Sequence, residues 1–142
     1  MKTAIFALLC FLSSFACKAQ GGIVMYFCGE YKHGKEIHIS SSFSVGSLTV
    51  MVKSQKAMHL TDVQLEFDRF DSVKNEFVLY KKFDFSLDPE DAYICFSKTK
   101  DNDLVISEPG IYRVVLFSQR DKVVTSALVE IVPAKSKRHK MK

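Results

Sequence analysis

The chain has no tryptophan, no glycine-rich phosphate loop and no long apolar run after its first twenty residues. Gly21 and Gly22 form an isolated pair, so the backbone cradle that holds nucleotide phosphates is not predicted. A helix that crosses a bilayer needs about 20 apolar residues, and residues 20–142 contain no such run. There is also no internal repeat of fixed period, so residues 20–142 are expected to form one small soluble domain.

Patterns typical of catalysis and metal binding are also missing. The first two of the four histidines, His33 and His38, are five residues apart, and no His-x-His or His-Glu-x-x-His pattern occurs. No serine lies in a Gly-x-Ser-x-Gly or Ser-x-x-Lys arrangement, and no Cys-x-x-Cys is present. The sequence therefore predicts no catalytic residue, no metal ligand and no cofactor, and it does not favour an enzyme.

Two acidic loops, at residues 88–91 and 101–103, leave calcium binding open as an alternative. Oxygen-rich loops hold calcium when they supply about six ligands, but neither loop has the Asp-x-Asp-x-Asp-Gly order of a known calcium loop. The ordinary explanation is that aspartate and asparagine cap the backbone of turns.

The first nineteen residues have the three parts of a secretory signal peptide. Lys2 precedes an apolar run, and a stretch of small residues ends with Cys17 and Ala19. The apolar run is much shorter than a membrane-spanning helix requires. We therefore predict export to the periplasm or the extracellular space, with cleavage between Ala19 and Gln20.

The cleavage region allows one further interpretation. An Ala-Gln junction after a short signal that starts with lysine resembles secreted proteins of the Bacteroidota. Lipidation of Cys17 is the alternative, although Ser14 stands at the position where a lipoprotein signal has an apolar residue. Cys28 and Cys95 remain after cleavage; in an oxidising compartment they allow one disulfide, and buried free thiols are the other alternative.

The positive net charge of +4 comes from the C-terminal end of the chain. All 16 acidic residues lie between residues 20 and 132, where they outnumber the basic ones. Residues 134–142 are predicted to be an unfolded tail because they are small or basic and contain no acidic residue. Its basic residues, which would make only weak, salt-sensitive contacts with anionic polymers, are Lys135, Lys137, Arg138, Lys140 and Lys142.

From residue 36 onward, apolar and polar residues alternate with a period of two, which is typical of strands with one buried face. The pattern predicts seven to nine strands and no helix. Lys81 interrupts an apolar phase, so a bulge is expected near it. Phe70, Tyr80 and Tyr31 fall outside the apolar phase and hint at a contact surface. The apolar phase comprises Ile37, Ile39, Phe43, Val45, Leu48, Val50, Val52, Val63, Leu65, Phe67, Phe77, Leu79, Phe83, Phe85, Leu87, Tyr112, Val114, Leu116, Val123, Ala127, Val129 and Ile131.

Residues 108–132, EPGIYRVVLFSQRDKVVTSALVEIV, resemble the last two strands of bacterial immunoglobulin-like and fibronectin type III-like domains. In those domains a Gly-x-Tyr element opens the penultimate strand and the tyrosine hydroxyl binds nearby backbone; Gly110 and Tyr112 match it. The resemblance implies structural roles for both residues and an all-β fold, a single immunoglobulin-like antiparallel β-sandwich over residues 20–133. An antibody-type domain is not expected, because its tryptophan is absent and Val114 stands where its second cysteine would be.

Members of this sandwich group mostly serve as binding, spacer or surface-assembly modules. The resemblance therefore implies a non-enzymatic secreted or periplasmic binding or structural module that contacts a protein or cell-surface partner through a sheet face or end loops. The alternative is a small secreted inhibitor or effector that blocks an enzyme with a loop. Fold resemblance alone does not identify the partner.

Overall fold

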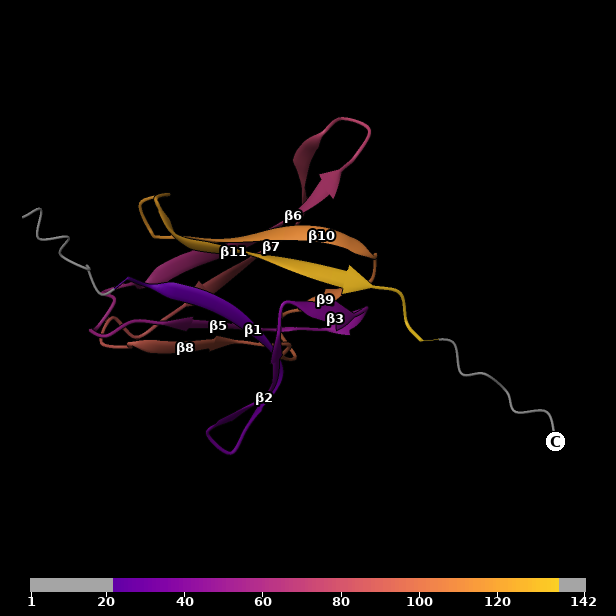
Figure 1. Cartoon of the computed structure of the whole chain (residues 1–142). Coiled ribbons are helices and arrows are strands. Elements are labelled where there is room, and N and C mark those ends of the chain that lie inside the picture. The colour runs from indigo at the N-terminus through magenta and orange to yellow at the C-terminus, as the bar shows by residue number, and fades with distance from the viewer. Residues whose placement is uncertain (1–21, 136–142) are drawn as a thin grey trace, which may run out of the picture.

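The computed structural model describes residues 22–135, in which all regular structure is β-strand. Nine strands form two facing sheets, and two short strands form a small ladder beside them (Figure 1). The four-stranded sheet has the order β2 (Lys35–Ser40), β1 (Val24–Lys32), β5 (Thr49–Lys53) and β8 (Tyr93–Phe96). The five-stranded sheet has the order β3 (Ser42–Ser44), β11 (Val123–Val132), β10 (Gly110–Phe117), β6 (Asp62–Asp71) and β7 (Glu76–Ser86). The small ladder pairs β4 (Gly46–Ser47) with β9 (Val105–Ile106).

The predicted all-β immunoglobulin-like sandwich is confirmed, with one difference in strand direction. β3 runs parallel to β11, whereas the prediction had antiparallel strands only. This parallel pair exists because the chain crosses from one sheet to the other between β2 and β3 and meets the last strand in the same direction.

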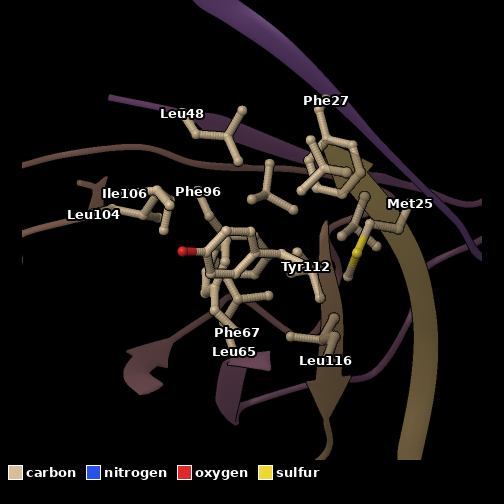
Figure 2. Close-up of a cluster of buried hydrophobic side chains, with 14 of the residues drawn as sticks. Met25, Phe27, Leu48, Leu65, Phe67, Phe96, Leu104, Ile106, Tyr112 and Leu116 are labelled. Carbon is tan, nitrogen blue, oxygen red and sulfur yellow. The ribbon is translucent and has the colours of Figure 1, made fainter. Parts of the chain in front are cut away.

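The core lies between the two sheets and is built from the side chains of each sheet that face the other. Figure 2 shows Tyr112 surrounded by apolar side chains from several elements, among them Phe67 of β6, Phe96 of β8 and Ile106 of β9. Alternating residues of β10, namely Tyr112, Val114 and Leu116, are fully buried, as the period of two predicts. The predicted alternation is therefore correct for the residues of β10 that enter the core, whereas in β5 all residues from Thr49 to Val52 are buried.

Two β-bulges change the facing of apolar residues in the outer strands. In the pairing of β6 with β7, Asp68 lies opposite Leu79 and Phe67 opposite Lys81, so Tyr80 is an extra residue. The bulge predicted near Lys81 is thus confirmed. The prediction that Leu79 shares the buried phase of Phe83 is wrong, because one extra residue reverses the facing of everything before it.

The second bulge lies between β10 and β11. Leu116 is opposite Thr125 and Phe117 is opposite Val123, which leaves Val124 as the extra residue. The prediction that Val123 shares the buried face of Ala127 is therefore wrong: Val123 is exposed, and Val124 packs against the core instead.

The β1–β2 hairpin extends from the four-stranded sheet on the side away from the other sheet (Figure 1). Ile37 and Ile39 were predicted to be buried, and both are exposed. The reason is that β2 is an edge strand that pairs only with β1, and no second layer covers the hairpin.

Several predictions lie outside the described residues. These are the signal peptide at residues 1–19, its cleavage site, Cys17 and most of the tail at residues 134–142. Within residues 22–135 no helix is long and apolar enough to cross a membrane.

Candidate functional site

Tyr112 and Gly110 form a corner at the start of β10. The Tyr112 hydroxyl donates a hydrogen bond to the Glu108 carbonyl oxygen at 2.6 Å, and its ring packs edge-on against the Tyr80 ring at 5.2 Å between centroids. Burial is the main cause that raises the pKa of Tyr112 to about 12. The hydrogen bond implied by the resemblance is present, and it holds the loop before β10 rather than facing a ligand.

Gly110 sits where a side chain would collide. A Cβ at this position would lie 2.8 Å from Nε of Arg69, and the φ angle of Gly110 is +154°. Nε and Nη2 of Arg69 donate to the Pro109 carbonyl oxygen at 3.0 and 2.6 Å, which fixes the guanidinium there. A residue without Cβ therefore fits this position best.

Cys28 and Cys95 are free cysteines that lie on strands separated by β5. Neighbouring strands are about 4.8 Å apart, so strands on either side of a third are about 10 Å apart. A disulfide needs Cα atoms within about 7 Å. The fold therefore favours the second alternative, free thiols, and burial raises the pKa of both.

Within the described residues, the histidines and the acidic loops are not gathered into a site. Asp88 accepts a hydrogen bond from the Glu90 amide at 2.9 Å, which is turn capping. His33 lies in the β1–β2 turn, and His38 packs against the Phe43 ring. Within residues 22–135 no three histidine, cysteine, aspartate or glutamate side chains come together to hold a metal ion.

Three tyrosines of the four-stranded sheet lie around the carboxylate of Glu36. Oε1 of Glu36 accepts hydrogen bonds from the hydroxyls of Tyr26 and Tyr93, and the Tyr31 ring packs against the Tyr93 ring. The bond from Tyr26, followed by that from Tyr93, holds the pKa of Glu36 below its ordinary value. These contacts hold β2 against β1 and β8. The alternation of the sequence could not show them.

Replacing Glu36 with glutamine should make the contribution of these hydrogen bonds to stability independent of pH. The pKa of Glu36 is lowered in the folded chain, so its stabilising effect is present above its ordinary pKa of 4.5 and is lost as the pH falls through the folded value. We expect Glu36→Gln to lower stability at pH 7 by on the order of 1 kcal/mol. The difference from the parent should shrink as the pH falls below the ordinary pKa of 4.5, as measured by urea unfolding. Glu76→Gln, at an exposed glutamate of β7, is the control and should keep the parent's pH profile.

The outer face of β10 and β11 carries apolar side chains that the core does not use. Residues that lie opposite each other in antiparallel strands share a face, and this pairs Val115 with Ser126 and Phe117 with Val123. Val123 and Leu128 are exposed there, together with Ile111. A shallow hollow of about 340 Å³ lies among these strands and β6, lined by Glu66, Asp68, Arg113, Val115, Phe117, Val123 and Ser126.

An ion pair between Arg113 and Asp68 lies on this outer face. Nη2 of Arg113 lies 2.8 Å from Oδ2 of Asp68, and the Arg113 guanidinium stacks over the Phe77 ring at 4.6 Å. Asp68 is buried, and Arg113 is its ion-pair partner. The pair is pre-positioned between apolar neighbours, which is the composition of a protein contact surface.

Of the three residues that hint at part of a contact surface, Phe70 and Tyr80 line one hollow, and Tyr31 is not among the residues that line it. Phe70 packs against Phe77, Tyr80 packs against Tyr112 in the core, and Tyr31 lies on the β1–β2 hairpin.

The sequence signal for the outer face is the set of apolar residues out of phase with the core, Ile111, Val115 and Leu128. Val123 could not be assigned to this face, because only the bulge turns it outward.

The fold and this face define a small immunoglobulin-like β-sandwich. No family model matches the chain, and no curated protein matches it either. The chain is similar in fold to an immunoglobulin-like protein of Pseudomonas aeruginosa, with 13% identity and a TM-score of 0.47 over 80% of this chain and 99% of that one. It is also similar to a superoxide reductase (neelaredoxin) of Ignicoccus hospitalis, with 8% identity and a TM-score of 0.42 over 78% of this chain and 80% of that one.

Proposed function

We propose that the chain is an exported, non-enzymatic binding module whose outer β10–β11 face holds a protein partner. The observation that carries this proposal is the set of exposed apolar side chains around the Arg113–Asp68 pair. Exposed apolar groups on a sheet face mark interaction sites when they gather in one patch. The first nineteen residues and their resemblance to secreted proteins of the Bacteroidota support export.

The chemistry of the face indicates the kind of partner. Arg113 is already neutralised by Asp68, and Glu66 adds a negative charge to the hollow, so an anionic polymer has no attraction here. An apolar protein surface would instead cover Val123 and Leu128 and exclude water from the charged pair. The partner we propose is therefore a protein with an apolar patch rather than a nucleic acid or an acidic polysaccharide.

Photo-crosslinking in the native host tests the proposal. A photoreactive residue at Leu128, which is 57% exposed, should give a defined adduct, and Val123→Glu in the same chain should reduce that adduct several-fold. The matched control places the same residue at Val24 of the other sheet, which is 52% exposed and should give none. Equal adducts at both positions, or none at Leu128, would contradict the proposal.

The intact mass of the exported protein tests the predicted signal cleavage. It should correspond to residues 20–142.

One observation favours the inhibitor alternative, in which a loop blocks an enzyme. The β6–β7 turn stands out from the sandwich (Figure 1), and Val73 at this turn is 93% exposed. Oδ1 of Asp71 accepts the amides of Val73 and Lys74 at 2.9 and 3.1 Å, so the turn is held in one shape. A pre-formed loop loses little entropy on binding. An adduct from Val73 to a hydrolase, without one from Leu128, would support this alternative over the sheet face.

A further inference from the structure

A second hollow lies at the four-stranded sheet, where β1 and β5 separate. Their pairing ends at Cys28 and Thr49, and residues 30–32 of β1 pair only with β2. Before β5, the chain turns away so that Ser47 pairs with Val105 of β9. The separation leaves a hollow of about 400 Å³, within the range of small-ligand sites, lined by Gly29, Glu30, Tyr31, Ser47, Leu48, Thr49, Ser97 and Lys98.

Thr49 is the residue that points to a ligand. It is only 4% exposed, yet its hydroxyl makes no hydrogen bond within residues 22–135. In the same part of the chain, no side-chain oxygen is both sealed from the surface and without a partner, so this hydroxyl opens into the hollow. Because it reaches the hollow, this hydroxyl bonds water there, and a ligand whose polar group takes that water's place keeps the hydrogen bond.

The other lining groups favour a neutral ligand with many hydroxyls. Ser47 and Ser97 bring two more hydroxyls to the hollow. The two charged groups are paired within the chain, since Glu30 lies 2.8 Å from Lys32 and Lys98 lies 3.7 Å from Asp103. Because these charges are balanced locally, the hollow offers hydrogen bonding rather than a net charge to its ligand.

Tyr31 supplies an aromatic wall, which its packing against Tyr93 at 5.9 Å holds in place. Aromatic rings bind apolar surfaces, and Tyr31 has its hydroxyl as a polar handle. A sugar ring combines the two properties that this wall and the hydroxyls require, because it presents C–H groups on its faces and hydroxyls around its edge. A purely apolar ligand would leave Thr49 unpaired.

We propose that this hollow binds one neutral sugar unit of a saccharide, with Thr49, Ser47 and Ser97 bonding its hydroxyls and Tyr31 contacting its ring. The site lies on the four-stranded sheet and is separate from the protein-binding face of β10 and β11. The chain would thus hold a saccharide on one sheet and a protein on the other.

NMR titration of the protein with cellotriose, chitotriose and mannotriose tests this site. We expect at least one of these neutral trisaccharides to shift the amide signals of Gly29, Tyr31 and Ser97 in a saturable way. Thr49→Val, which keeps the shape and removes the hydroxyl, should weaken that binding about tenfold. Tyr31→Ala should weaken it similarly, whereas Tyr31→Phe should keep most of the affinity.

The controls separate the proposal from its alternatives. Thr125→Val on β11 makes the same chemical change away from the hollow and should leave binding unchanged. Sialyllactose is the anionic probe: binding of this sugar alone, lost in Lys98→Ala, would overturn the neutral-saccharide proposal. Absence of shifts around the hollow with all three neutral trisaccharides would overturn it as well. Neither outcome affects the crosslinking test of the β10–β11 face.

Discussion

Tyr112→Ala should lower the free energy of unfolding by about 3–5 kcal/mol, the usual cost of removing a large aromatic side chain from a core. The side chain is fully buried, and Figure 2 shows it among residues contributed by both sheets. The truncation leaves a cavity at the centre of the sandwich and removes the bond to Glu108. Urea unfolding followed by circular dichroism measures the loss.

Tyr112→Phe separates the hydrogen bond from the packing. This variant keeps the ring and removes only the hydroxyl, so it should cost about 1 kcal/mol, the net value of one hydrogen bond. If both variants unfold at the parent's urea concentration, Tyr112 has no structural role at the corner.

Gly110→Ala should cost about 1–3 kcal/mol through backbone strain and a steric conflict. Its φ angle of +154° is unfavourable for a residue with Cβ, and that atom would meet Arg69 Nε at 2.8 Å. Arg69 can move away only by breaking its bonds to the Pro109 carbonyl. The measurement is again urea unfolding.

Gly29→Ala is the matched control for this substitution. A Cβ at Gly29 would lie 3.5 Å from the Ile37 carbonyl oxygen, an ordinary contact. This variant should therefore unfold close to the parent. An equal loss in both variants would mean that strand position, rather than the corner, determines the cost at Gly110.

The central strands and the corner were predictable from the sequence for a physical reason. In β5 and β10, which have a neighbour on both sides, regular pairing keeps the period of two, so every second residue packs into the core between the sheets. Met51 and Val115 are buried as well, outside that core cluster, which the alternation did not predict. Gly110 and Tyr112 were found through a local motif that needs only residues 108–112. Both signals are short in range, so the sequence alone carries them.

The outer strands were predicted less well because their facing depends on partners that are distant in sequence. A bulge exists only relative to the opposite strand, so Val124 could not be recognised as an extra residue from β11 alone. The exposure of Ile39 likewise depends on which layer covers β2, and sequence alternation carries no information about that. The hollow at Thr49 has the same origin, since it results from the separation of two strands.

The two bulges also bear on how such a face could arise in evolution. Each bulge is a one-residue length difference between paired strands, and each one sets the facing of apolar residues: Leu79 in β7 and Val123 in β11. A single-codon insertion or deletion at either place would exchange outward and inward residues in one strand while the other strands keep their registers. Partner recognition in this scaffold can therefore be gained or lost by a change in strand length, without substitution of any residue of the face.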